Sequence, residues 1–198
     1  VNQQLKADRS SIYAVDVTDW AAYVANPNSQ NEIQKIIAHE IGRSIDDYLL
    51  SLFSSATSQS GVTTLGKAHF TQAMRVLNLA NVPMTGRKVI VDSYFLEDIL
   101  NVNEVISRDY NATTSAFITG RIKDPVYGFE VYVSNLLPQD TAWFFHESFM
   151  QVAIQKGADY KEMDLEPATN VPSHRVRAET VFGAKLFDSA RAFKIYNA

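Results

Sequence analysis

Apolar residues recur at three- and four-residue steps between Ser29 and Phe53, and this pattern predicts one long amphipathic helix. Ser29 and Glu32 have the spacing of a capping box, which predicts that the helix begins there. At 1.5 Å per residue the helix would be roughly 35–40 Å long. The residues of the apolar stripe are Ile33, Ile36, Ile37, Ile41, Ile45, Tyr48, Leu49, Leu52 and Phe53.

Two further helices are predicted downstream. An amphipathic pattern from about residue 65 to residue 80 places four apolar side chains inward, those of Phe70, Ala73, Met74 and Leu77. Ser93 can cap a short helix that runs through Leu100. The polar stretch 54–64 is rich in Ser, Thr, Gln and Gly, and this composition predicts a loop.

The remaining pattern predicts several strands. Phe129, Val131 and Val133 alternate with polar positions, as one face of a half-buried strand does. The spacing of Phe149, Val152 and Ala153 predicts a helical segment after the aromatic run 143–145. Residues 101–115 show no period and are predicted to form a surface loop. The predicted strands are 9–17, 88–92, about 116–122, 127–134, 161–166, 174–182 and 192–196.

Composition narrows the possible functions. With 198 residues and 46% hydrophobic content, the chain can bury a core as one large domain or two small lobes. Its 18 basic and 22 acidic residues give a net charge of −4, which disfavours a protein that grips phosphates. There are 0 cysteines, so disulfides and thiolate metal sites are excluded. No apolar run approaches the roughly 18–20 residues that span a bilayer, which predicts no membrane segment.

The sequence gives little support to catalysis. His39-Glu40 and His146-Glu147 begin like zinc-hydrolase motifs, but Arg43 and Met150 stand where the second histidine is needed. No Gly-x-Ser-x-Gly elbow is present, and the run 85–88 is a turn and not a phosphate-binding loop. We therefore predict no catalytic, cofactor-binding or metal-binding residues. A soluble hydrolase whose site is assembled from distant residues stays open as an alternative.

The order of the segments carries more information than any one of them. A strand that ends in Val15-Asp16-Val17 precedes the long helix, and Asn81-Val82-Pro83 closes the second helix before the run 86–91. The strand 128–135 and the run Arg177-Ala178-Glu179, with Gly183 after it, complete the series. Over nearly the whole chain this succession resembles the major capsid proteins of tailed bacteriophages, which have the HK97-type fold.

The resemblance implies an α+β, HK97-like capsid fold with a long spine helix, a peripheral lobe, an axial lobe and an extended β-arm. Such proteins have an N-terminal segment and a first arm strand before this point, so we expect the arm here to be truncated. The absent initiator Met also suggests a segment of a longer product. The implied division is 1–27 for the returning arm strand, 28–82 and 157–186 for the peripheral lobe, and 83–156 and 187–198 for the axial lobe.

The implied function is that of a virion structural protein that self-assembles, in the host cytoplasm, into an icosahedral shell around double-stranded DNA. Its expected partners are further copies of itself, in hexamers and pentamers, with a scaffolding protein, a portal and decoration proteins. No sequence-specific DNA binding, cofactor, enzyme activity or membrane contact is expected. An encapsulin-type bacterial compartment shares the fold and stays open as an alternative.

Charged residues in the last third of the chain are candidates for contacts between subunits, although solvated strand edges would show the same pattern. Intersubunit ion pairs fix register and partner choice more than they add affinity. Some members of the family also crosslink through a Lys–Asn isopeptide bond promoted by a Glu, and Glu179 and Asn170 stand in a similar motif. The candidates are Lys161, Glu162, Asp164, Glu166, Arg175, Arg177 and Glu179.

Overall fold

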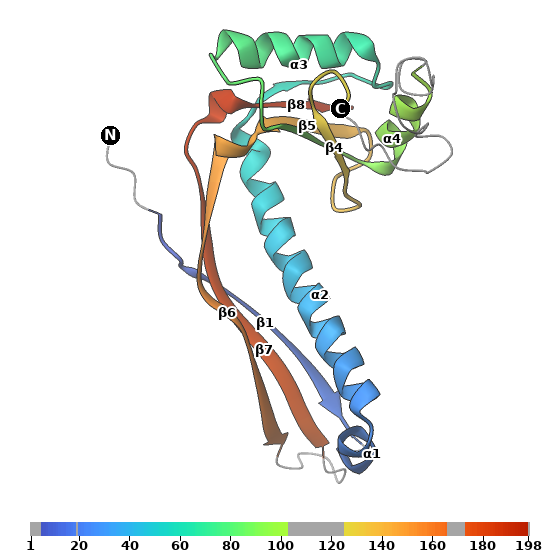
Figure 1. The fold of residues 1–198 in the computed structure, drawn as a ribbon, viewed down its shortest axis with the longest axis vertical. Coiled ribbons are helices and arrows are strands. Elements are labelled where there is room, and N and C mark those ends of the chain that lie inside the picture. The colour runs from blue at the N-terminus through green and yellow to red at the C-terminus, as the bar shows by residue number, and fades with distance from the viewer. Residues whose placement is uncertain (1–4, 19, 103–124, 166–172, 198) are drawn as a thin grey trace. The chain divides into compact units, whose positions relative to one another are not determined.

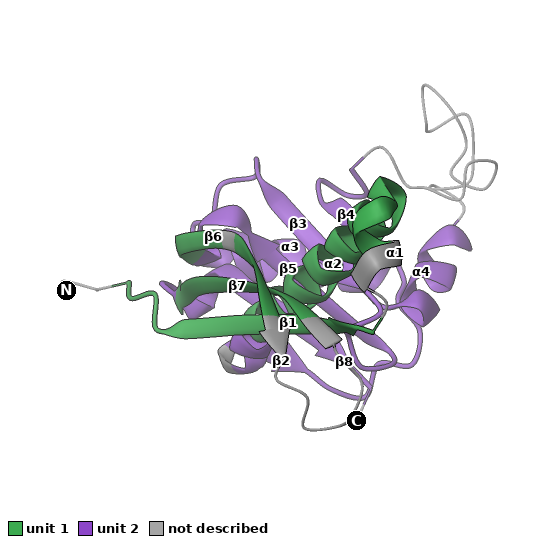
Figure 2. Ribbon diagram, turned by 90° about the horizontal axis from the view of Figure 1, so that it is seen from below, with its two compact units in different colours: residues 1–49, 151–185 green, residues 50–150, 186–198 purple. Residues whose placement is uncertain are grey.

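The structure is a computed structural model that describes residues 5–18, 20–102, 125–165 and 173–197. The chain divides into two compact units, shown in two colours in Figure 2. Unit 1 comprises residues 1–49 and 151–185, and unit 2 comprises residues 50–150 and 186–198. Both units combine helix and sheet, so the predicted α+β class is confirmed.

Unit 1 is built on a three-stranded sheet with one long helix against a single face (Figure 1). Helix α2 (Pro27–Ser51) packs on the sheet, where Ile37 and Ile41 join Val176 and Ala178 in one hydrophobic cluster. The short helix α1 (Trp20–Ala25) adds Tyr23 to that cluster. In their order across the sheet, the strands are β1 (Arg9–Val17), β7 (Ser173–Leu186) and β6 (Met150–Leu165).

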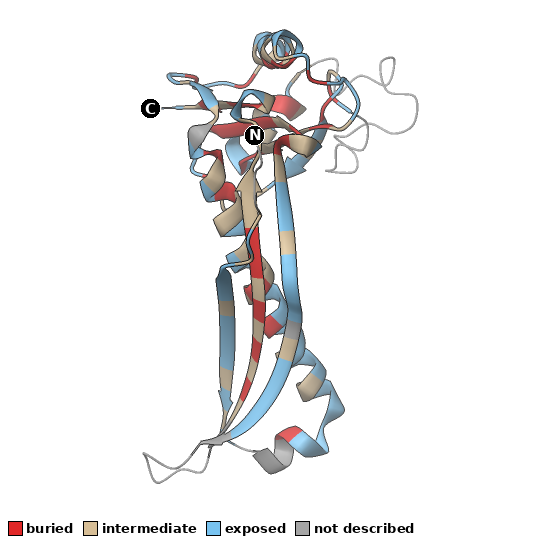
Figure 3. Ribbon diagram, turned by 90° about the vertical axis from the view of Figure 1, so that its left-hand side faces the viewer, coloured by how far each residue is buried: buried red, intermediate tan, exposed pale blue. Residues whose placement is uncertain are grey.

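The central strand β7 separates the two faces of this sheet. Val176 and Ala178 face α2, so the alternating positions Arg175, Arg177 and Glu179 lie on the opposite side, here called the outer face. In Figure 3 the buried positions lie along β7, whereas most residues of β1 and β6 are exposed. The helix therefore buries one face of one strand well and leaves the flanking strands open.

Unit 2 contains a five-stranded sheet that is covered on both faces. Helix α3 (Lys67–Leu79) and helix α4 (Ser93–Leu100) belong to the cluster on one face. The short 3-10 helices η1 (Leu52–Ser55) and η2 (Glu147–Phe149) contribute to the cluster on the other. In their order across the sheet, the strands are β2 (Thr57–Gln59), β8 (Ala192–Tyr196), β5 (Thr141–His146), β3 (Arg87–Val91) and β4 (Glu130–Val133).

Alternation along β5 divides its aromatic residues between the two clusters. Phe144 is fully buried, and its ring lies 5.3 Å from that of Phe70 and 5.1 Å from that of Phe129, centroid to centroid. Trp143 faces the other way and stacks on Phe53 at 4.5 Å. Edge-to-face and offset pairs of this kind add to the area that the rings bury. Trp143 and Phe144 are therefore core residues, and Phe145 packs against the second cluster as a partly buried residue.

Most predicted elements are present close to the predicted positions. Strand β1, helices α2, α3 and α4, and strands β3 and β8 each lie within a few residues of their prediction. In α3, Phe70, Ala73 and Leu77 are buried as predicted. The predicted strands 161–166 and 174–182 are parts of β6 and β7, and 127–134 contains β4. The strand 116–122 and most of the loop 101–115 lie outside the described residues.

Several local predictions were wrong. Phe149, Val152 and Ala153 do not form a helix: β6 begins at Met150, because pairing with β7 overrides the local spacing. Helix α2 starts at Pro27 and not at a Ser29 cap, with Asn26 Oδ1 accepting the N–H of Asn28 at 3.1 Å.

Four smaller differences concern caps, loops and burial. Asp92, and not Ser93, caps α4, since its carboxylate accepts the N–H groups of Tyr94 and Phe95. The predicted loop 54–64 contains strand β2, and helix α1 was not predicted. Ile36, which the stripe placed inward, is 51% exposed.

The predicted lobe 28–82 extends over both units. Helix α3 lies in unit 2, where Phe70 and Leu77 join Phe193 and Ile195 of β8 in one cluster. The assignment of the arm, peripheral and axial segments of the chain therefore stays a prediction.

Candidate functional site

Except for Glu166, which lies outside the described residues, the candidate contact residues lie along the two long strands of unit 1. Arg175 on β7 stands opposite Asp16 on β1, and both side chains lie on the outer face. The Arg175 guanidinium donates to both oxygens of the Asp16 carboxylate, at 2.6 and 2.9 Å. These hydrogen bonds hold the pKa of Asp16 below its usual range and raise that of Arg175. Both side chains are about half exposed, so the pair contributes little to stability.

Lys161 belongs to a small charged group on β6. Asp159 forms ion pairs with the ammonium groups of Lys156 and, at 3.7 Å, of Lys161. The hydrogen bond from Lys156 lowers the pKa of Asp159, and the same bond raises the pKa of Lys156. Asp159 and Lys156 were not among the predicted residues. In the sequence, Lys156 and Asp159 look like an ordinary pair of surface charges. Only the pairing of β6 with β7 shows that they lie on the same sheet as Arg175.

Arg177 and Glu179 continue the outer face of β7 and are both partly buried. The Arg177 Nε atom is buried and has no hydrogen-bond partner among the described residues. Glu179 is close enough to Lys156 to raise the pKa of that lysine, and Arg177 opposes this effect. The face therefore alternates positive and negative groups that already interact within one chain.

The other candidates are less defined. Glu162 lies on β6. Burial raises the pKa of the Tyr23 phenol, and the negative charge of Glu162 raises it further. The side chain of Asp164 is not described, and Glu166 and Asn170 lie outside the described residues. The structure therefore brings some of the predicted contact residues together, in a row on β6 and β7.

Exposed apolar side chains accompany these charges on both edge strands. On β1, Ile12 is 54% exposed on the outer face, and Tyr13 is 37% exposed on the helix face. On β6, Tyr160 faces the helix, where its hydroxyl donates to the Gln34 carbonyl, and Met163 faces outward. Sequence patterns did not single out these residues, because alternation alone does not show that a strand is an edge.

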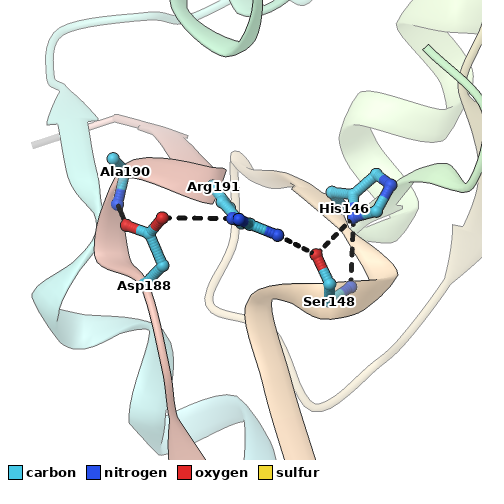
Figure 4. Close-up of polar contacts among 5 residues, drawn as sticks. All are labelled: His146, Ser148, Asp188, Ala190 and Arg191. Carbon is cyan, nitrogen blue, oxygen red and sulfur yellow. Dashed lines mark hydrogen bonds and ion pairs between the residues drawn. The ribbon is translucent and has the colours of Figure 1, made fainter. Parts of the chain in front are cut away.

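A polar network in unit 2 links η2 to η3 (Ser189–Arg191) and is drawn in Figure 4. The His146 Nδ1 atom accepts the Ser148 N–H at 3.1 Å and lies 2.7 Å from the Ser148 hydroxyl oxygen. Arg191 donates to Ser148 Oγ and to Asp188, whose other oxygen accepts the N–H of Ala190.

These hydrogen bonds hold η2 and η3 together. A serine nucleophile needs a base that is oriented by a third group, and here the Asp188 carboxylate binds Arg191 instead of His146. Within the described ranges, no three His, Asp or Glu side chains are grouped so that they could hold a metal ion. The network therefore gives no support to the hydrolase alternative.

Among the described helices, none is both long and apolar enough to cross a bilayer. A family model described as phage capsid protein matches residues 7–198, nearly the whole chain. No curated protein sequence matches the chain.

Solved structures with a similar fold come from phages and from a virus-like particle. A structure from Mycobacterium phage Che8 aligns with a TM-score of 0.75 and 21% identity, covering 96% of this chain and 71% of that one. The capsid of the cyanophage P-SCSP1u aligns with a TM-score of 0.71 and 13% identity, over 96% and 72% of the two chains. A virus-like particle from Pyrococcus furiosus aligns with a TM-score of 0.60 and 9% identity, over 94% and 74%. At these identities the alignments show a shared fold.

Proposed function

Because the chain belongs to the phage capsid protein family, we propose that it is the major capsid protein of a phage head. The observation that carries this proposal is a family match over residues 7–198, on a chain with the fold of phage capsid structures. Membership implies a place in the virion and a shell of many copies. The role of the chain is structural.

The finer proposal concerns what the copies build. We propose an icosahedral shell of hexamers and pentamers that encloses double-stranded DNA and is assembled in the host cytoplasm. A scaffolding protein, a portal and decoration proteins would assist assembly. The net charge of −4 supports a lining that tolerates packed DNA without binding it tightly.

The test is assembly of the purified protein, with a scaffolding protein supplied. Electron microscopy should show closed particles with icosahedral symmetry, and particles from infected cells should hold DNA that nuclease cannot reach. If the protein yields only monomers under these conditions, the proposal fails.

The likeness to the Pyrococcus virus-like particle keeps one alternative in view, a compartment of the encapsulin type. Such a shell would form particles of the same construction around an enzyme. Protein cargo in place of protected DNA would establish this alternative.

A further inference from the structure

We draw no further inference here: the strongest candidate, the surface patch that Tyr132, Trp143 and Lys194 form on one face of the five-stranded sheet of unit 2, carries nothing, because the Trp143 indole N–H that lacks an acceptor there is itself buried and nothing in the described part of the chain shows what covers the patch.

Discussion

Unit 1 and unit 2 bury their apolar residues in different ways. Unit 2 covers both faces of its sheet with hydrophobic clusters, and its edge strands β2 and β4 are only 3 and 4 residues long. Unit 1 has one cluster on one face, and its edge strands are 9 and 16 residues long. Within the described residues, unit 2 thus covers both faces of its sheet, whereas unit 1 leaves one face of its sheet exposed together with apolar side chains such as Ile154.

The largest effect is expected where unit 2 is most tightly packed. Phe144→Ala removes a fully buried ring that contacts two other rings, and such a change costs about 3–5 kcal/mol. Denaturant unfolding followed by Trp143 fluorescence, in a Trp20→Phe background, measures the loss. Tyr132→Ala is the control, since Tyr132 is 50% exposed. A comparable loss from both variants would remove the distinction between core and surface.

The next prediction concerns the entry of the chain into unit 1. A Cβ at Gly183 would collide with the backbone of Lys6 and Ala7, which crosses β7 at this point. Gly183→Val should displace residues 5–8 and cost roughly 1–3 kcal/mol, as overpacking does. Limited proteolysis should then cleave the N-terminal segment faster. Gly157→Val is the matched control, because open space surrounds Gly157. Equal cleavage of both variants would show that the crossing needs no glycine.

A smaller effect is expected from the helix cap of unit 2. The Asp92 carboxylate accepts the N–H groups of Tyr94, Phe95 and Asp140. Asp92→Ala should lower the free energy of unfolding by about 1 kcal/mol, the usual value for a lost cap. Hydrogen exchange should increase in α4 and leave β1 and β7 unchanged. Faster exchange in β1 would mean that the two units are not separate in stability.

The smallest effect is expected from the exposed pair in unit 1. The folded-state pKa of Asp16 is depressed by its hydrogen bonds from Arg175, so its contribution exists above the unfolded value of 3.8 and is lost as the pH falls below it. Between neutral pH and about pH 5 this contribution is fully present, so the difference in stability between Asp16→Asn and the unsubstituted protein should stay constant. Unfolding measured from pH 5 to pH 2 should then decline more steeply for the unsubstituted protein. Parallel declines would show that the pair is not formed in solution.

Sequence patterns predicted the elements of both units but not their surroundings. The stripe of α2 and the inward positions of α3 were visible because a 3.6-residue period records burial on one side. Strand β6 was missed before Lys161, because both of its faces are exposed and it therefore lacks alternation. Ile36 was predicted to face inward but is exposed, because the period of a helix does not show how wide the sheet beneath it is.

The charged row was predicted in type but not in pairing. Arg175 and Lys161 stand out in the sequence, yet Asp16 is far from Arg175 along the chain and becomes its partner through the register of β1 and β7. The His146 network was likewise beyond prediction, since Ser148 and Arg191 come together only when η2 meets η3. The sequence therefore predicts which types of residue are involved, whereas their partners are seen only in the tertiary structure.

The pairing of β1 with β7 also affects the order in which the two sheets can form during translation. Arg9 stands opposite Phe182, so β1 cannot pair with β7 until the residues between the two strands have been translated. Loop closure over such a separation is slow compared with local helix formation. Residues 50–150 of unit 2 are contiguous and are translated before β6 and β7 exist. Neither sheet is therefore complete until its last strand has been translated, β7 in unit 1 and β8 in unit 2.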